Sequence, residues 1–202
     1  HCPVGLPKYR SKTASGCCCN HMFKKIETAI AGCYELQPMV QVDSRGRFVK
    51  TYHADYFASN DLETNFREQY YTISRKGVLR GMHFQKPPHQ HNKLVYCTSG
   101  IILDVVLDLR IGSPSYLKHF SLKLSEELGN MLYLPTGLAH GFYSVTEATV
   151  AYNVSTVYVP EFDSGILWSS IGMNWSNMFP DVSERDAEFI ALENFQSPFT
   201  FA

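Results

Sequence analysis

The sequence lacks any long hydrophobic run, and no apolar stretch approaches the roughly 18 residues that a bilayer-spanning helix needs. It also lacks an excess of charge of either sign, because 18 Lys and Arg face 19 Asp and Glu and leave a net charge of −1. A chain this close to neutral lacks the excess of basic residues that is typical of nucleic-acid-binding proteins. We therefore expect neither a membrane nor a nucleic acid as a partner.

Cysteine is scarce beyond residue 21, where only Cys33 and Cys97 remain. Two cysteines give no disulfide framework and fit a reducing, cytoplasmic location. Residues 1–21 hold the other four cysteines but lack the apolar stretch of a signal peptide and the ligand spacing of a zinc site. We expect residues 1–21 to be a leader that is disordered or stems from cloning, and residues 22–202 to form one domain.

Strand signals dominate the domain. In residues 101–110 (IILDVVLDLR) the apolar side chains from Leu103 to Leu109 alternate with Asp104, Asp108 and Arg110, which predicts a strand with two distinct faces. Residues 131–134 and 149–159 are also short and β-rich, with turn signals at 43–46 and 99–100. Plausible helices are limited to residues 54–65 and 184–193. This pattern predicts an all-β fold, a barrel of antiparallel strands with a few short helices.

Two glycine-flanked histidines lie far apart in the chain, His83 in GVLRGMHFQ (77–85) and His140 in LPTGLAHGF (134–142). Such segments can meet across a small barrel. With Lys93 and Tyr152 on neighbouring predicted strands, they would supply a base, a cation and a phenol to one pocket. That set suits proton transfer next to a carbonyl group.

A second motif surrounds His140. Gly129, Pro135, Gly137 and His140 follow the spacing of the second cupin signature, with Ser144 in place of its final Asn. Cupins have a jelly-roll fold of antiparallel strands, which agrees with the strand pattern predicted here.

The first cupin signature is incomplete. It needs His-x-His followed by Glu, but after His89 and His91 the chain has Val95 and Tyr96 where the carboxylate belongs. A metal-dependent cupin, such as a dioxygenase with His89, His91 and His140 as ligands, remains a rival hypothesis. In the other interpretation His89 and His91 are exposed side chains of a Pro-rich turn.

The chain from residue 22 to about 199 resembles the nucleotide-sugar epimerases of the dTDP-4-dehydrorhamnose 3,5-epimerase family. The resemblance rests on the order and spacing of seven segments: 43–48 (DSRGRF), 77–85 (GVLRGMHFQ), 93–95 (KLV), 104–110 (DVVLDLR), 112–115 (GSPS), 135–142 (PTGLAHGF) and 182–186 (VSERD). It implies a cupin jelly roll without metal or other cofactor. It also implies a homodimer that exchanges sheet segments, so that each pocket contains residues of the partner.

The resemblance assigns four catalytic roles in inverting C3, C5 or both of a dTDP-linked 4-keto-6-deoxyhexose. His83 would be the base and Asp186 its carboxylate partner, Lys93 would stabilise the enolate, and Tyr152 would return the proton from the opposite face. From the residues alone, Tyr152 would be interpreted as a side chain that packs in the core, and Asp186 as the cap of a helix.

The resemblance also implies a substrate-binding shell. It comprises Arg45, Arg80, His140, Tyr158, Asp163 and Arg185, with Arg45 on the pyrophosphate and Tyr158 stacked on the base. Arg45 beside Gly46 also reads as an ordinary turn residue.

Several positions of the binding shell depart from the family. Lys50 replaces a Glu that binds the base, and Glu68 and Tyr70 replace Gln and Asn. Asn153 replaces Lys, and Ser169-Ser170 replaces an Asn-Asp or Asp-Pro pair. Glu68 would accept the thymine N3–H while Lys50 binds a carbonyl oxygen, or the base is cytosine, whose N3 accepts. The open alternatives are thus an epimerase of a CDP-linked sugar, a C3-only epimerase, and a sugar-nucleotide binding protein without turnover.

Overall fold

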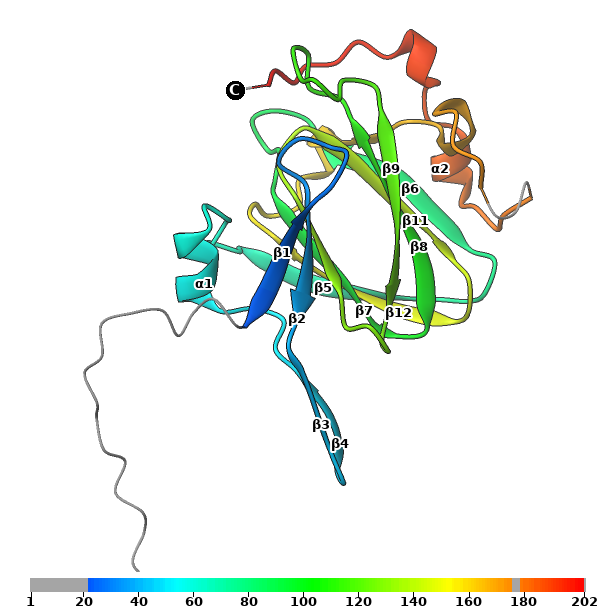
Figure 1. Cartoon of the computed structure of the whole chain (residues 1–202). Helices are drawn as coiled ribbons and strands as arrows, with labels where there is room; N and C mark the ends of the chain where they lie inside the picture. The colour runs from blue at the N-terminus through cyan, green and yellow to red at the C-terminus, as the bar shows by residue number, and fades with distance from the viewer. Residues whose placement is uncertain (1–21, 176–178, 202) are drawn as a thin grey trace, which may run out of the picture.

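Two antiparallel β-sheets face each other and enclose the central core (Figure 1). The computed structural model describes residues 22–175 and 179–201. One sheet has six strands in the order β1-β2-β10-β7-β12-β5, and the other has five in the order β13-β6-β11-β8-β9. The strands are β1 (Phe23–Glu27), β2 (Tyr34–Pro38), β3 (Val40–Asp43), β4 (Gly46–Val49), β5 (Glu68–Ser74), β6 (Leu79–Gln85), β7 (Lys93–Ser99), β8 (Ile101–Asp108), β9 (His119–Ser125), β10 (Met131–Leu134), β11 (Leu138–Ser144), β12 (Ala148–Val154) and β13 (Asp163–Gly165). The fold is a cupin-like jelly roll, as predicted.

The alternation predicted for residues 101–110 is present in β8, but both of its faces are buried. Ile102 and Val106 point between the sheets, where they pack with side chains of β7, β11 and β12. Val105 and Leu107 point outward and are covered by the C-terminal segment. Asp104 lies on the inner face with no exposed surface, which puts a carboxylate inside the barrel.

Helices are short, and both predicted ones end earlier than expected. α1 (Ala54–Ser59) is capped by His53 and ends before Asp61, whose φ of 56° is incompatible with the right-handed helix predicted to residue 65. α2 (Glu184–Ala187) is capped by Ser183. The chain then becomes extended, and Ile190 forms an isolated β-bridge with Ile166. Three 3₁₀ turns complete the helical content of the described residues: η2 (Pro160–Phe162), η3 (Trp168–Ser170) and η4 (Leu192–Asn194). None of the helices described is long and apolar enough to span a membrane.

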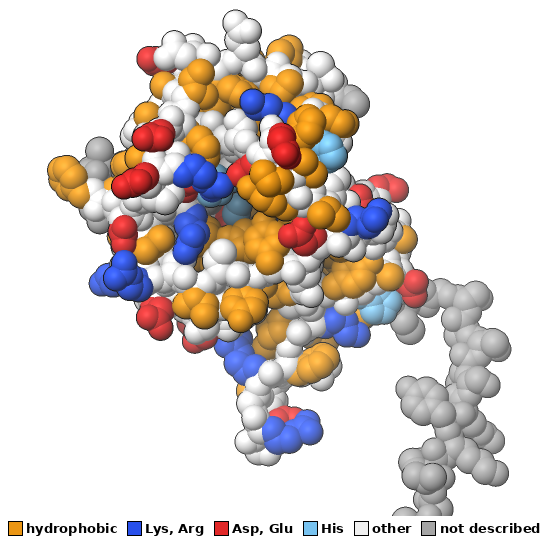
Figure 2. Space-filling view, turned by 180° about the vertical axis from the view of Figure 1, so that it is seen from behind, with side chains coloured by type: hydrophobic (Ala, Val, Ile, Leu, Met, Phe, Trp, Pro, Cys, Tyr) orange, Lys and Arg blue, Asp and Glu red, His pale blue; other side chains and the backbone are white. Residues whose placement is uncertain are grey.

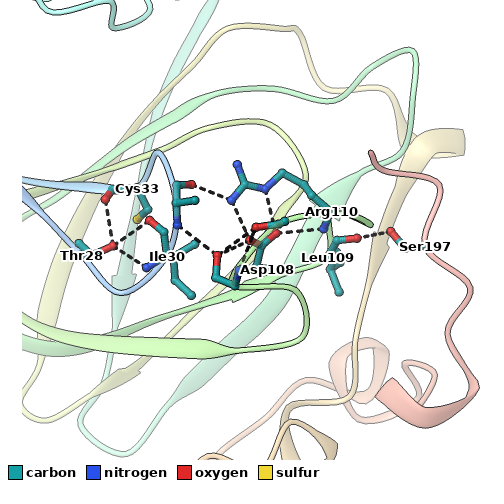
Figure 3. Close-up of polar contacts among 10 residues, drawn as sticks. Thr28, Ile30, Cys33, Asp108, Leu109, Arg110 and Ser197 are labelled. Carbon is teal, nitrogen blue, oxygen red and sulfur yellow. Dashed lines mark hydrogen bonds and ion pairs between the residues drawn. The ribbon is translucent and has the colours of Figure 1, made fainter. Parts of the chain in front are cut away.

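A buried ion pair holds one end of the barrel together (Figure 3). Asp108 accepts hydrogen bonds from Nε and Nη2 of Arg110, each at 2.8 Å, and from the hydroxyls of Ser113 and Ser115. Arg110 Nη2 also donates to the carbonyl of Ala31 at 2.7 Å. The cluster thereby ties the β1–β2 turn to the end of β8.

The β3–β4 hairpin projects away from the barrel (Figure 1). Its turn pairs Asp43 with Gly46, as the turn signal predicted. Val42 is 71% exposed and Phe48 is 58% exposed. A lone two-stranded hairpin is only marginally stable in water, so these apolar side chains call for a covering surface.

Candidate active site

A pocket of about 350 Å³ opens between the two sheets, within the size range of small-molecule sites. The molecule is hollowed on the face seen in Figure 2, where basic side chains lie beside the opening. Most of the residues predicted from the sequence line it. These are Glu68, Tyr70, Arg80, His83, Lys93, His140, Tyr152, Tyr158, Asp163 and Arg185, joined by Thr72, Phe84, Gln85, His91, Phe142 and Val154.

The two histidines noted in the sequence do meet, but as a cross-strand pair on the adjacent strands β6 (His83) and β11 (His140) of one sheet, not across the barrel. The flanking glycines make this possible. A Cβ on Gly81, which has a φ of 136°, would lie 2.5 Å from the Cα of Gly141. The glycines therefore allow the two strands to approach closely beside the pocket.

His83 is backed by Asp186, with 2.9 Å between its Nε2 and the carboxylate Oδ1. The backbone N–H of Gly81 donates to the other oxygen of Asp186 at 3.1 Å. Burial lowers the pKa of His83, and this outweighs the opposite effect of Asp186, so the imidazole is neutral at pH 7. Burial alone would raise the pKa of Asp186, but His83, the Gly81 N–H and Arg185 together hold it at about 2. The pair is therefore a neutral base beside a carboxylate anion. Ser183 also caps α2, so the helix-cap interpretation of Asp186 is not needed.

Lys93 begins β7 and is buried, with 6% of its surface exposed. Its Nζ donates to the carbonyl of His83 at 3.4 Å, and it makes no ion pair with any described residue. Burial lowers the pKa of Lys93 to about 8, although Asp163 and Asp104 act in the opposite sense. A buried ammonium without a direct counter-ion can stabilise negative charge that forms in the pocket.

Tyr152 lies on the inner face of β12 with Val150 and Val154, as predicted. Burial raises the pKa of Tyr152, and Tyr70 and Asp104 add to the effect, so the phenol keeps its proton at neutral pH. The ring of Tyr70 stacks on it with 4.8 Å between centroids and 18° between planes. The two residues are also directly paired across β5 and β12.

A second histidine–carboxylate pair, not identified from the sequence, lies deeper in the pocket. His140 Nε2 is 2.8 Å from Asp104 Oδ2, and both residues are buried. The imidazole also meets the Tyr152 ring edge-to-face, with 6.0 Å between centroids. The signal was present in the sequence, since Asp104 shares the face of β8 that carries Ile102 and Val106.

The expectation that His91 is an exposed turn residue is wrong. His91 lines the pocket, its Nδ1 lies 3.3 Å from both the Gln85 amide nitrogen and the Thr156 hydroxyl, and burial lowers its pKa to about 3. Its Nε2 is buried and has no hydrogen-bond partner among the described residues. The Pro-rich turn folds inward because Gln85 holds it, donating to the His89 carbonyl at 2.9 Å.

The outer part of the pocket is polar and interconnected. Glu68 accepts from the backbone N–H of Tyr158 at 2.7 Å, and the Tyr158 hydroxyl lies 3.4 Å from Asp163. Arg185 donates to Asp163 through Nη1 at 2.7 Å and reaches His83 and Asp186 with its other nitrogens. Arg80 is fixed from the side by the Ser74 hydroxyl, which accepts from its Nε at 3.0 Å.

Two predicted binding residues lie apart from this pocket. Arg45 is at the tip of the β3–β4 hairpin, where its guanidinium binds Asp43. Lys50 follows β4, and its Nζ lies 3.9 Å from the Met22 sulfur. Neither lines the pocket that contains Glu68, so the proposed joint role of Lys50 and Glu68 is not realised within one chain.

The ligand set of the rival metal cupin does not assemble. In residues 22–175 and 179–201 no three His, Cys, Asp or Glu side chains converge as metal ligands. His140 instead binds Asp104 through Nε2, and His91 binds Gln85 and Thr156 through Nδ1.

Comparison with known proteins identifies the family. The sequence model described as dTDP-4-dehydrorhamnose 3,5-epimerase matches residues 27–194. The chain is 38% identical to the dTDP-4-dehydrorhamnose 3,5-epimerase of Methanothermobacter thermautotrophicus, covering 84% of this chain and 95% of that protein. It is 34% identical to a dTDP-4-dehydrorhamnose 3-epimerase of Streptomyces niveus, covering 81% of each.

Solved structures agree with the sequence comparison. The structure of the Legionella pneumophila dTDP-6-deoxy-D-glucose-3,5-epimerase, in complex with dTDP-4-keto-L-rhamnose, superposes with a TM-score of 0.84 at 29% identity. The match covers 89% of this chain and all of the Legionella chain. The chain is therefore a member of the dTDP-4-dehydrorhamnose 3,5-epimerase family of isomerases.

Proposed function

We propose that this protein epimerises C3 and C5 of a dTDP-linked 4-keto-6-deoxyhexose, without a cofactor, through an enolate. The observation that carries the proposal is that one pocket combines a neutral imidazole, a protonated phenol and a buried ammonium that forms no ion pair with any described residue. The ketone at C4 acidifies the protons at C3 and C5, so each group has a defined task in moving them.

His83 takes the proton from carbon, and Asp186 stabilises the imidazolium that results. Lys93 stabilises the enolate oxygen as charge develops on it. Tyr152 donates a proton to the opposite face of the carbon. This division is supported by topology, since His83 comes from the five-stranded sheet and Tyr152 from the six-stranded sheet, and the pocket lies between them.

The residues of the binding shell divide between the diphosphate, the base and the sugar. Arg185 and Arg80 face the pocket as cations suited to the diphosphate, since guanidinium groups bind phosphate oxygens in pairs. Tyr158 and Glu68, joined by a backbone hydrogen bond, are suited to stacking on and hydrogen bonding to the base. His140 contributes to the sugar site from beside Tyr152.

We further infer that the protein is a homodimer with shared pockets. The hairpin that carries Arg45 projects from the barrel and exposes Val42 and Phe48, which is expected of a segment that packs on a second copy of the chain. A partner's hairpin would bring Arg45 and Lys50 to the outer part of the pocket, which they do not reach within their own chain.

Mixed dimers test this sharing. Arg45→Ala and His83→Gln homodimers should each be impaired. In a heterodimer of the two variants, one pocket combines an intact His83 with an intact Arg45 of the other copy. Random mixing should therefore restore about a quarter of the wild-type rate. No recovery on mixing, despite subunit exchange observed by native mass spectrometry, would contradict the shared pocket.

A C3-only epimerase is the second candidate, and the Tyr70–Tyr152 stack favours it. One acid can serve both carbons only if the sugar turns in the pocket or the phenol moves, and the stack restrains the phenol.

The cytoplasmic location expected from the free thiols of Cys33 and Cys97 stays a prediction.

Incubation with dTDP-4-keto-6-deoxyglucose in D₂O tests the function. NMR should show loss of the protons at C3 and C5, and a coupled reductase that consumes only the doubly inverted product should turn over. Exchange at C3 alone with an idle reductase would establish the C3-only activity. No exchange with either the dTDP-linked or the CDP-linked sugar would disprove the epimerase.

A further inference from the structure

Arg185 contacts three groups at once through its guanidinium. Its Nη1 donates to Asp163 Oδ2 at 2.7 Å, its Nε to Asp186 Oδ1 at 3.1 Å, and its Nη2 to His83 Nε2 at 2.9 Å. The last contact joins a permanent cation to the residue to which we assign the role of base.

The contact restricts the protonation state of His83. A guanidinium only donates hydrogen bonds, so Nε2 must accept through its lone pair, and the ring proton of the neutral imidazole then lies on Nδ1. In that tautomer one nitrogen already carries a proton and the lone pair of the other is engaged. No nitrogen is left to take a proton from carbon, whichever of the two faces the sugar.

The alternative partner of the same nitrogen requires the opposite tautomer. Asp186 Oδ1 also lies 2.9 Å from His83 Nε2, and a carboxylate anion only accepts, so that bond needs a proton on Nε2. Nδ1 is then free to act as the base. Arg185 and Asp186 therefore compete for one nitrogen, and the winner decides whether His83 is basic.

The packing lets Arg185 give way more easily than Asp186. The Arg185 side chain is 53% exposed, whereas that of Asp186 is 3% exposed and also accepts from the Gly81 N–H. The ring of Phe189 contacts both His83 and Arg185. It meets the His83 imidazole edge-to-face, and its centroid lies 5.6 Å from the guanidinium carbon of Arg185. Phe189 fits there because Gly165 has no side chain, since a Cβ would lie 2.3 Å from the ring.

We propose that Arg185 masks the base and that the diphosphate of the nucleotide sugar removes the mask by binding the guanidinium. The inference rests on the proposed function. Phosphate oxygens form paired hydrogen bonds with arginine and offer more charge than Asp163 alone. Arg185 leaves His83 Nε2, the proton shifts to that nitrogen, and Asp186 holds it. Arg185 is thus a positioning residue that makes His83 basic only when a diphosphate is bound.

The tautomer of His83 can be read directly from the ¹⁵N shifts of its ring in long-range ¹H–¹⁵N NMR, with His83→Gln used for assignment. In the wild-type protein without nucleotide, we expect the Nδ1–H form. Saturating dTDP should convert it to the Nε2–H form. Arg185→Met should give the Nε2–H form with or without dTDP. The other charges that face His83, Lys93 and Asp186, are unchanged in this comparison.

Arg75→Met is the matched control, because it removes an exposed arginine that pairs with Asp181 outside the pocket. It should behave as the wild type. An Nε2–H form in the wild type both with and without dTDP, or an Nδ1–H form that persists in Arg185→Met, would overturn the proposal. The Arg185→Met arm needs no ligand, so it remains decisive even if dTDP does not bind and the proposed function fails.

Deuterium exchange into a truncated substrate gives an independent kinetic readout. We expect exchange at C3 of the free 4-keto-6-deoxy sugar to rise about tenfold when pyrophosphate is added to the wild type, roughly the effect of one hydrogen bond from a charged donor. In Arg185→Met the exchange should be as fast without pyrophosphate and insensitive to it. A wild type that pyrophosphate does not activate, alongside normal turnover of the full substrate, would refute the mask while leaving the epimerase intact.

Discussion

Tyr70 and Tyr152 stack face to face, 4.8 Å apart and directly paired across β5 and β12. The resemblance noted in the sequence leads us to expect Asn at position 70, but this chain has Tyr70, which holds the proposed acid against a second aromatic ring. Burial, Glu68 and Asp163 raise the pKa of Tyr70 to about 12, so both stacked phenols are neutral at pH 7. The stack therefore acts on the position of Tyr152 rather than on its charge.

Replacing Tyr70 tests whether the stack restrains the acid. Tyr70→Asn should raise the ratio of C5 to C3 inversion by about two- to tenfold, the effect of losing one aromatic pair. Tyr70→Phe keeps the ring and should leave the ratio unchanged. Position-resolved deuterium NMR measures both ratios. Equal ratios in all three proteins would show that the stack has no part in choosing the carbon.

The pH profile follows from the shifted groups. The base must be neutral, so kcat/KM should rise with pH through the pKa of His83, which burial places below 6.5. Lys93 must be charged, so the rate should fall through its pKa of about 8. Lys93→Arg keeps a charge at all accessible pH values, and any remaining activity should lose the alkaline limb. An unchanged alkaline limb in that variant would assign it to another group.

Stability depends on the Asp108–Arg110 pair at the end of the barrel. Asp108→Ala leaves a buried guanidinium without its carboxylate and should lower the free energy of unfolding by about 3–5 kcal/mol. Asp181→Ala, which breaks an exposed pair with Arg75, should cost about 1 kcal/mol or less. Urea denaturation measures both. Similar losses in the two variants would contradict the ranking.

The sequence predicted much of the site because strand alternation and motif order constrain it locally. The inward position of Tyr152 follows from the period of two in β12, and the pairing of His83 with His140 follows from glycines that let β6 and β11 approach. The predicted lengths of both helices were wrong, because local backbone conformation that cannot be inferred from composition ends each helix early. Asp61 takes a left-handed conformation after α1, and the chain beyond Ala187 is drawn into a bridge with Ile166.

The contacts between distant segments could not be predicted. The ring of His91 is held inside the pocket by Thr156, which is 65 positions away in the sequence and whose hydroxyl lies 3.3 Å from His91 Nδ1. Arg185 reaches His83 over 102 positions of sequence, and both side chains pack on Phe189. The pairing of Asp104 with His140 was within reach, since a carboxylate on the inner face of a buried strand requires a partner.

The central claim is that His83 and Tyr152 act on opposite faces of the sugar, and Tyr152→Phe tests it most directly. Deuterium at C3 is measured in recovered substrate and in product, with His83→Gln as the reference that lacks the base. We predict that Tyr152→Phe keeps measurable exchange into recovered substrate while inversion falls by about 10²–10⁴-fold, the usual contribution of an acid or base. His83→Gln should lose both. Inversion at the wild-type rate in Tyr152→Phe, or a parallel loss of exchange and inversion in a folded variant, would contradict the account.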